Sequence, residues 1–584
     1  MGLVNEGRER VSEGAEPVEV AERDIATWLR ERVGSRAASD AIAVHDGERW
    51  VRVGASEFVT EVERLRAGLT GAGVTERDRV VVMGPTSAEW SRLDLAIMCA
   101  GAITVPVYPG SSEEQCRSML RTARPSIAFV ASSDDVETLH RVDPDLDVRR
   151  LDRETLDGLS GDPRGIDPVP EAVADPTSIA TIVFTSGTTG APKGVPLTHE
   201  QLVWTARQAG RQLETVLGSG GSTLLFLPLA HIFARVVVLA ALDSGVELAY
   251  GRSIETVPED LRSYRPTFLL VVPRMLERVI SGGRKQAEGW RRPVYDWGIR
   301  AARRWSKSER RGPLLRLQHG LANLLVLRQL RAGLGGRVEV TVSGGARLDP
   351  DLAHVIEGAG ITVLEGYGLT ETTGPATVAP PQQARIGTVG TPIPGMEIRI
   401  SSDDEVLVRG PSVTTGYVTE ESPDIDDPIR PEESFDGDGW FRTGDHGSLS
   451  ADGHLTITGR AKDVIVTDGG QNVAPVPLED ALVAHPAIDQ AMVIGDGRPF
   501  VAALVALTED APGDDGELDE AVRRAVDDAN AAVGGEVGIS EFRIVGRAFD
   551  EEHGELTPTM KLRREEILEH FTDDVAAIYD EVEQ

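Results

Sequence analysis

Cysteine and long apolar runs are scarce in this chain of 584 residues. The two cysteines, Cys99 and Cys116, are too few for a disulfide framework or a cysteine-rich metal site. We interpret both as small packing residues rather than catalytic thiols. No apolar run reaches the roughly 18–20 residues that a membrane-spanning helix needs. The charged N-terminus lacks the apolar segment of a secretory signal, so the sequence predicts no integral membrane segment and a cytoplasmic location.

Positive charge is also in short supply. The chain has 60 Lys and Arg residues against 94 Asp and Glu residues, a net charge of −34, and a pI near 4.8. A field of this sign repels nucleic acid and anionic membranes, which argues against either as a general partner. We hypothesise a high-salt cytoplasm, in which surface carboxylates hold water and salt screens their repulsion.

The length exceeds what one core usually organises, so two or more domains are expected. In the first 400 residues, short apolar runs alternate with helical segments. The run Arg79–Met83 is followed by a capping-box pattern, Thr86 to Glu89, a helix, and the run Ile103–Val107. This βαβ order predicts parallel strands covered by helices. Similar runs lie at Ile127–Ala131, Ile179–Phe184, Phe268–Val272, Val338–Val342 and Ile361–Leu364.

After residue 400 the pattern changes. Short alternating strands are expected at Glu405–Arg409 and Leu455–Thr458, and strands and helices follow to the end of the chain. We therefore expect an α/β protein with two domains. Residues 1–459 form a large domain of mostly parallel sheets flanked by helices, with a β-rich subdomain, and residues 460–584 form a small α+β domain.

A polar loop follows the run Ile179–Phe184. It reads TSGTTGAPKG from Thr185 to Gly194. Its glycines allow close backbone approach, its hydroxyl and amide groups supply donors, and Lys193 supplies positive charge, a combination that suits a polyphosphate. It is not a Walker A motif, because Lys193 follows a proline and is itself followed by glycine. The plainer alternative is a Gly/Ser/Thr-rich linker.

This loop resembles the signature of the adenylate-forming (AMP-binding) superfamily, which includes acyl-CoA synthetases, luciferases and peptide-synthetase adenylation domains. The resemblance spans nearly the whole chain, and the segment LPLAHIFAR is most similar to long-chain fatty acyl-CoA synthetases. Many of those enzymes carry glutamate where this chain has Ala234. The other matching motifs are LPLAHIF at 227–233, SGGA at 343–346, EGYGLTE at 365–371, WFRTGD at 440–445, GRAK at 459–462 and GELTPTMK at 554–561.

The resemblance implies how ATP and Mg²⁺ bind. Tyr367 should stack on adenine, Asp445 should accept the ribose hydroxyls, and Glu371 with the Thr185 hydroxyl should hold Mg²⁺. The plainer alternatives are a helix-start carboxylate for Glu371 and a surface ion pair for Asp445. The full nucleotide-binding set is Thr185, Ser186, Gly187, Thr188, Thr189, Gly190, Lys193, Gly344, Gly345, Ala346, Glu365, Gly366, Tyr367, Gly368, Thr370, Asp445, Arg460 and Lys561.

Catalysis of adenylation needs cations more than it needs bases, because a fatty carboxylate is already ionised at neutral pH. Opposite charges at about 4 Å are worth roughly 4 kcal/mol at an effective dielectric of about 20. Lysine usage supports Lys561 in this role: of only five lysines, Lys193, Lys462 and Lys561 occupy three motif positions. The expected catalytic set is Lys561, Thr370, Glu371 and Arg460.

The family also implies a hinge and an acyl site. Lys462 resembles the hinge about which the small domain rotates between adenylation and thioester formation. His231 should separate the nucleotide from the acyl pocket, although a lone histidine in an apolar segment is often a satisfied core residue. The expected substrate-binding set is His231, Gly345, Gly368 and Gly470.

The expected activity is that of a long-chain fatty-acid–CoA ligase, which uses ATP, Mg²⁺ and CoA and releases AMP and pyrophosphate. The alternatives are an acyl-AMP ligase that loads a carrier protein, a CoA ligase for a medium-chain, branched or aryl acid, and a non-catalytic binder of the same fold. Peripheral membrane contact and a homodimer are left open.

Overall fold

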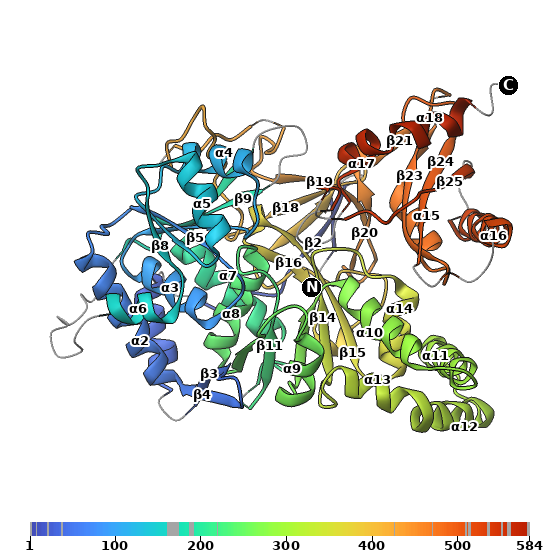
Figure 1. The fold of residues 1–584 in the computed structure, drawn as a ribbon, viewed down its shortest axis with the longest axis horizontal. Coiled ribbons are helices and arrows are strands. Elements are labelled where there is room, and N and C mark those ends of the chain that lie inside the picture. The colour runs from blue at the N-terminus through green and yellow to red at the C-terminus, as the bar shows by residue number, and fades with distance from the viewer. Residues whose placement is uncertain are drawn as a thin grey trace. The chain divides into compact units, whose positions relative to one another are not determined.

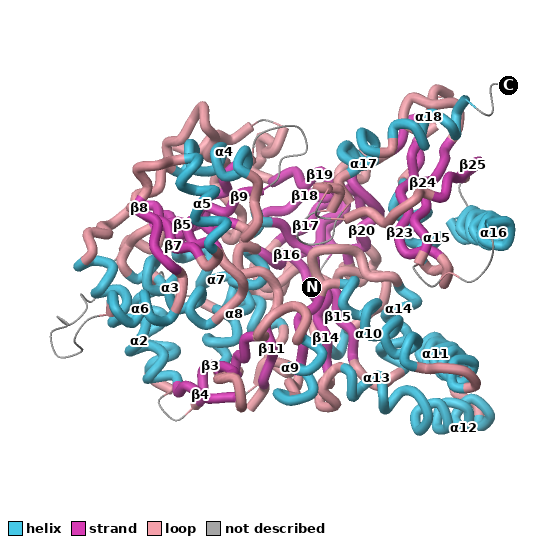
Figure 2. The backbone as a smooth tube through the Cα atoms, in the orientation of Figure 1, coloured by secondary structure: helices cyan, strands magenta, loops and turns pink. Residues whose placement is uncertain are grey.

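A computed structural model describes most of the chain (Figures 1 and 2). The chain divides into two compact units. Unit 1 comprises Met1–Arg399, Leu407–Arg442 and Ser450–Leu455, and unit 2 comprises Ile400–Val406, Thr443–Leu449 and Thr456–Gln584. The predicted domain boundary between residues 459 and 460 stays a prediction. The described residues are 3–6, 9–19, 23–36, 39–160, 174–185, 192–218, 220–425, 427–431, 433–469, 471–508, 511, 515–533, 538–550, 553–556 and 562–580.

The first sheet of unit 1 has the strand order β10-β9-β6-β5-β7-β8. Its strands β5, β6 and β7 are parallel and buried, as expected of apolar runs covered on both faces. The βαβ order predicted from the sequence is confirmed. The strands are β5 (Arg79–Met83), β6 (Ile103–Val107), β7 (Ile127–Val130), β8 (Asp147–Arg150), β9 (Ile179–Thr185) and β10 (Lys193–Thr198), and the helices between them are α3 (Ala88–Cys99), α4 (Glu113–Ala123), α5 (Ser133–Val142) and α6 (Arg153–Leu159).

The capping box predicted at Thr86 and Glu89 is wrong by one residue. Ser87 caps α3, with its hydroxyl accepting from the backbone N–H of Trp90 at 3.1 Å. The Thr86 hydroxyl instead donates to the carbonyl of Leu227 at 2.6 Å and accepts from the N–H of Leu229 at 3.1 Å. Thr86 thus holds the LPLAHIF segment against the end of β5.

Two further sheets complete the α/β part of unit 1, with the orders β11-β12-β3-β4 and β13-β14-β15-β16. In the second of these, β13 (Phe268–Val271), β14 (Val340–Ser343) and β15 (Thr362–Leu369) are parallel, and β16 (Gly374–Val378) returns antiparallel to β15. Ser343 lies opposite Glu365. The motifs SGGA and EGYGLTE therefore meet at one edge of this sheet, because both follow the carboxyl ends of neighbouring parallel strands.

A group of helices between β13 and β14 was not predicted. It consists of α10 (Pro273–Gln286), α11 (Arg291–Lys307), α12 (Pro313–Ala322), the π-helical turn η3 (Asn323–Leu327) and α13 (Arg328–Gly333). α11 packs closely on α14 (Pro350–Gly358): a Cβ on Gly358 would lie 2.1 Å from the carbonyl oxygen of Ala302. This contact fixes the group to the helix that leads into β15.

Unit 2 contains a three-stranded sheet with the order β23-β24-β25 and the two-stranded sheet β21-β22. The apolar residues of β24 alternate between two cores, one against α15 and α16 and the other against α17 and α18. The elements are β21 (Ile465–Val466), β22 (Asn472–Val473), α15 (Pro475–Val483), β23 (Ile488–Ile494), β24 (Val501–Leu507), α16 (Asp515–Val533), β25 (Ile539–Ile544), α17 (Arg564–His570) and α18 (Thr572–Asp580).

The predicted strands after residue 400 are present as β18 (Glu405–Arg409) and β20 (Leu455–Arg460). Cys99 and Cys116 are both buried, and burial raises the pKa of each thiol. Within the described ranges, no helix is both long and apolar enough to cross a membrane. The remaining elements are β1 (Leu3–Glu6), β2 (Glu9–Glu13), α1 (Ile25–Trp28), η1 (Leu29–Gly34), β3 (Asp40–His45), β4 (Trp50–Gly54), α2 (Ala55–Gly71), α7 (His199–Gln212), β11 (Ser222–Leu225), α8 (Ile232–Ser244), β12 (Glu247–Tyr250), α9 (Val257–Tyr264), η4 (Thr370–Thr372), η5 (Pro381–Gln383), β17 (Glu397–Ile400), β19 (Phe441–Leu449) and η6 (Ala461–Asp463).

Candidate active site

An apolar pocket of about 880 Å³, its open mouth included, lies within unit 1. Helices α7 and α8 form one wall, and strands β13 to β16 form the other. The side chains of the helical wall are apolar, among them Leu213 directly after α7, and Val236 and Ala240 on α8. Six of the predicted site residues also line the pocket: His231, Gly344, Gly345, Gly366, Tyr367 and Gly368.

His231 begins the helix that runs along the pocket. Its Nδ1 accepts from the backbone N–H of Phe233 at 3.2 Å, so the side chain caps the N-terminus of α8. In the neutral ring Nδ1 is then the acceptor, and the proton is carried by Nε2. His231 can therefore be a histidine with a satisfied hydrogen bond and still act in the pocket, because it caps α8 and also lines the cavity.

The end of β15 and the turn into β16 carry the residues of the EGYGLTE motif. A Cβ on Gly368 would lie 1.9 Å from the carbonyl oxygen of Gly374, and Gly374 itself has a φ of +95°. Only glycine fits these positions without a backbone shift. Thr370 and Glu371 stand in the short turn η4 just beyond. The backbone therefore comes directly to the pocket surface beside Tyr367.

Glu371, Tyr417 and Lys193 form a cluster in unit 1. The Tyr417 hydroxyl donates to Oε1 of Glu371 at 3.1 Å, and Nζ of Lys193 lies 5.5 Å from the centre of the Tyr417 ring, a cation–π distance. Burial, together with the neighbouring Glu371 charge, raises the pKa of Tyr417 well above its ordinary value. The predicted metal ligand and the predicted phosphate-binding lysine thus share one neighbour. No motif had marked Tyr417.

The ends of the polar loop are fixed by strand pairing. Thr185 on β9 lies opposite Lys193 on β10, and Gly194 exchanges two 2.8 Å backbone hydrogen bonds with Val418. Lys193 and Tyr417 are therefore held by adjoining backbone. The five predicted phosphate-binding residues in the middle of this loop lie outside the described part of the chain; they are Ser186, Gly187, Thr188, Thr189 and Gly190.

Glu365, an acid of the predicted site, has a raised pKa. It is buried on β15, and burial raises its pKa to about 7 against the opposing backbone N–H groups of Leu348 and Gly387. The N–H of Leu348 lies 3.4 Å from Oε2. Glu365 therefore takes up a proton at a higher pH than an exposed glutamate does. Ala346, in the loop after β14 and two residues before Leu348, is exposed.

In unit 2 the structure brings Asp445 and Arg460 together. Nε of Arg460 lies 3.1 Å from Oδ1 of Asp445, a buried carboxylate on β19. The two groups predicted to contact ribose or phosphate therefore form an ion pair with each other, as the plainer alternative expects, and their role toward the nucleotide stays a prediction. Desolvation, and then the neighbouring charge of Arg460, lowers the pKa of Lys462.

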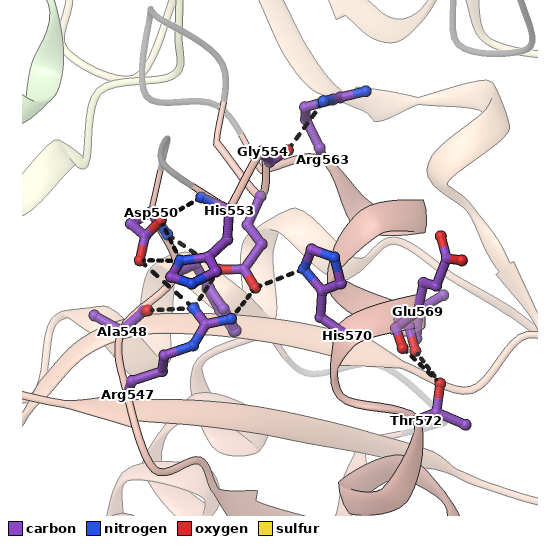
Figure 3. A network of polar contacts seen from close by, with 12 residues as sticks. Arg547, Ala548, Asp550, His553, Gly554, Arg563, Glu569, His570 and Thr572 are labelled. Atoms are coloured by element: carbon purple, nitrogen blue, oxygen red, sulfur yellow. Dashed lines mark hydrogen bonds and ion pairs between the residues drawn. The ribbon is translucent and has the colours of Figure 1, made fainter.

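The C-terminal motif is anchored by a polar network on its flanking residues (Figure 3). The Glu555 carboxylate is fully buried and accepts from Arg547 at 2.6 Å, from the N–H of Asp550 at 3.2 Å and from Nδ1 of His570 at 3.0 Å. Next to it, Leu556 forms an antiparallel bridge with Leu562. Lys561 lies outside the described residues, as does Gly470, but both flanks of the segment that carries Lys561 are held.

The comparisons define the class of protein. Residues 30–418 match the family described as AMP-binding enzyme, and residues 462–583 match the AMP-binding enzyme C-terminal domain. The chain belongs to this adenylate-forming family, and the predicted α/β fold is confirmed by solved structures of adenylate-forming enzymes.

Among individual proteins, the chain is similar to the long-chain-fatty-acid–CoA ligase FadD15 of Mycobacterium tuberculosis, with 39% identity over 564 residues, covering 91% of this chain and 92% of that protein. It is 28% identical to the long-chain-fatty-acid–CoA ligase ACSBG1 of Mus musculus over 612 residues, covering 92% and 83%.

Two solved structures show the same fold. The A-PCP didomain of a carboxylic acid reductase from Segniliparus rugosus, in complex with AMP, has a TM-score of 0.76 at 20% identity, covering 96% of this chain and 82% of that one. O-succinylbenzoate CoA synthetase from Bacillus subtilis, in complex with ATP and magnesium, has a TM-score of 0.68 at 21% identity, covering 92% and 98%.

Proposed function

We propose that the chain is an ATP-dependent long-chain fatty-acid–CoA ligase. In the first step, a carboxylate oxygen of the fatty acid attacks the α-phosphorus of ATP, and pyrophosphate leaves. In the second step, the CoA thiol loses its proton, its sulfur attacks the acyl carbonyl, and AMP leaves. The relatives named as long-chain-fatty-acid–CoA ligases, which the chain matches over more than nine tenths of its length, support this reaction.

The observation that carries the proposal is an apolar pocket bordered by two nucleotide motifs. The pocket extends along α8 from His231 to Ala241. At about 1.5 Å per residue, this stretch of helix is about 15 Å long. A fully extended chain advances about 1.2 Å per bond, so about twelve carbons fit along the helix alone. An acyl chain can lie there while its carboxylate meets the backbone at Gly345 and Gly368.

The residues present fit a magnesium ion. The carboxylate of Glu371 and the hydroxyl of Thr185 are hard oxygen ligands, and Mg²⁺ is commonly held by one or two protein groups together with substrate phosphates. The described residues contain no cluster of three or more His, Cys, Asp or Glu side chains that could hold a metal, which agrees with such a sparse site. When bound, the ion would neutralise charge on the phosphates.

The protein's own groups then position the substrates and neutralise their negative charge. Tyr417 orients the Glu371 carboxylate, and Lys193 brings a positive charge to the same place. We propose that Asp445 exchanges its bond with Arg460 for the ribose hydroxyls, that Thr370 contacts the α-phosphate, and that Lys561 stabilises the charge that develops during adenylation.

Several finer assignments belong to the same proposal. The large domain would comprise residues 1–459 and the small one residues 460–584, with Lys462 as the hinge between them. Gly470 would line the path of the CoA pantetheine. The acid-rich composition supports a high-salt cytoplasm as the site of action. Peripheral contact with a membrane would give access to long-chain acids.

Two half-reactions test the proposal. We expect Lys561→Ala to abolish acyl-adenylate formation, measured as acid-dependent exchange of pyrophosphate into ATP, while ATP binding persists. Lys462→Pro should spare this exchange and impair thioester formation. If the wild-type chain exchanges no pyrophosphate with any acid in a panel of short, medium, long, branched and aryl acids, the proposed function is wrong.

A further inference from the structure

One helical segment of unit 1 holds a row of leucines in solvent. α12 and η3 pack by one face on α11, where His319 stacks on Trp305 with ring centres 4.1 Å apart. Near η3, a Cβ on Gly298 of α11 would lie 2.5 Å from the Val326 side chain. Leucines spaced by three or four residues share another face. Their exposed fractions are 68% at Leu314, 63% at Leu317, 46% at Leu321, 61% at Leu324 and 50% at Leu325.

The same helices carry a net positive charge, opposite in sign to the net charge of the whole chain. Residues 290–333 contain eleven Arg and Lys residues but only two acidic residues, Asp296 and Glu309, whereas the whole chain has a net charge of −34. Arg310, Arg311 and Arg316 are exposed at the start of the leucine row. At an ionic strength of about 0.1 M, charges farther away than about 10 Å are largely screened, and at about 1 M this distance falls to about 3 Å. A partner at this surface therefore meets positive charge, not the acidic average.

We propose that the leucine row of α12 and η3, with the arginines beside it, docks on the surface of an anionic lipid bilayer. The leucines would enter the boundary between headgroups and acyl chains, and the arginines would contact lipid phosphates. Through this contact the enzyme would collect a fatty acid from the membrane, a use that rests on the proposed function. Docking itself needs no catalysis.

A bilayer fits this surface better than a second copy of the chain does. In a two-fold dimer the same patch faces itself, so the exposed Arg310, Arg311 and Arg316 of one copy would oppose those of the other. An acidic protein would satisfy the arginines, yet it must also supply an apolar groove for five leucines. An anionic bilayer presents acyl chains and phosphates along one plane. Figures 1 and 2 show α12 on the side of α11 away from the sheet β13 to β16, where a plane can reach it.

Vesicle flotation tests the proposal with the full-length protein and without ATP, acid or CoA. We expect binding to vesicles of phosphatidylcholine and phosphatidylglycerol (3:1) at 0.1 M KCl, and weaker binding to phosphatidylcholine alone. Replacing Arg310, Arg311 and Arg316 by Gln should weaken binding to the anionic vesicles about a hundredfold, since each cation near such a surface contributes about a factor of five. A variant with Ser at Leu314, Leu317, Leu321 and Leu324 should lose binding to both vesicles.

Matched controls make the result specific. Replacing the exposed Arg49, Arg153 and Arg262 of the same unit by Gln removes equal charge and should leave vesicle binding unchanged. All variants should keep the wild-type thermal midpoint and pyrophosphate exchange with a detergent-dispersed acid, so loss of docking is separable from loss of ligase function. The proposal is overturned if the wild type does not float with anionic vesicles, if the serine variant still does, or if that variant only converts a dimer into a monomer.

Discussion

Filling the far end of the apolar pocket should shorten the acids that the enzyme accepts. Ala240 lies on α8, more than two helical turns beyond His231, and its side chain faces the cavity. Ala240→Phe places a ring where the distal part of an acyl chain would lie. Acids that do not reach Ala240 should react as before, because the motifs around Gly345 and Gly368 are unchanged.

The magnitude follows from the methylenes that lose their contacts. Each buried methylene contributes about 0.8 kcal/mol. If the ring displaces four of them, a C16 acid loses about 3 kcal/mol, or about 200-fold in kcat/KM. An acid of eight carbons should change less than about threefold on the same basis. Ala240→Leu should give an intermediate loss, and Ala240→Ser, which hardly changes the volume, should behave as the wild type.

The assay is AMP release with saturating ATP and CoA across saturated acids from C6 to C18, with the thermal midpoint of each variant measured alongside. We expect the activity of the variant to fall sharply above one acyl chain length, while its thermal midpoint stays within a few degrees of that of the wild type. An equal loss at every chain length would refute the reasoning, since a general decrease reports disturbed folding or a pocket that does not hold the acyl chain.

Four further outcomes are expected. Arg235→Met removes the 2.6 Å and 2.9 Å hydrogen bonds of the buried Asp94 and should lower the unfolding free energy by about 3–5 kcal/mol in denaturant titrations. Adding Asp94→Leu to this variant should restore much of the loss. No recovery would contradict the pairing. Tyr417→Phe should raise the Mg²⁺ concentration for half-maximal pyrophosphate exchange about two- to tenfold by removing the bond to Glu371, and an unchanged Mg²⁺ dependence would exclude that role. Burial raises the pKa of Glu555, but hydrogen bonds from Arg547 and His570 outweigh burial and lower the pKa, so the network stabilises the fold above the unfolded-state pKa and this stabilisation is lost as pH falls through the folded-state pKa. Glu555→Gln should therefore flatten the acid side of the stability–pH profile. A profile identical to that of the wild type would count against the network. Activity and folding should increase from dilute buffer to molar KCl if the acid excess is an adaptation to salt, whereas full stability in dilute buffer would argue against it.

Much of the fold could be predicted because local patterns agreed with it. The runs at β5, β6 and β7 are short, apolar and separated by helices, which leaves little choice other than a parallel sheet. The helices α11 to α13 were missed because their apolar residues lie on both a packed and an exposed face, so no single stripe stands out. The cap of α3 was misplaced because Thr86 and Ser87 are adjacent hydroxyls, and only the contact with Leu227 decides between them.

The site could be predicted where its functional residues follow one another in the sequence. The motifs SGGA and EGYGLTE contain their own glycines, and the structure places both on one pocket. Tyr417 could not be found in this way, because its bond to Glu371 joins residues 46 positions apart and nothing near it in the sequence signals a site. The same holds for the ion pair of Asp94 and Arg235, which are separated by 141 positions.

The two walls of the apolar pocket differ in how freely mutation can alter them. Beside Gly368 and Gly374 the lining is main chain: a side chain on Gly368 would collide with the carbonyl oxygen of Gly374, and the φ of +95° at Gly374 disfavours any residue but glycine, so substitution is strongly restricted at both positions. Across the cavity, the helical wall offers replaceable side chains of graded size, such as Leu213 at the C-cap of α7, and Val236 and Ala240 on α8. New acyl preferences should therefore arise on the helices, while the end at which the nucleotide reacts stays the same through such changes.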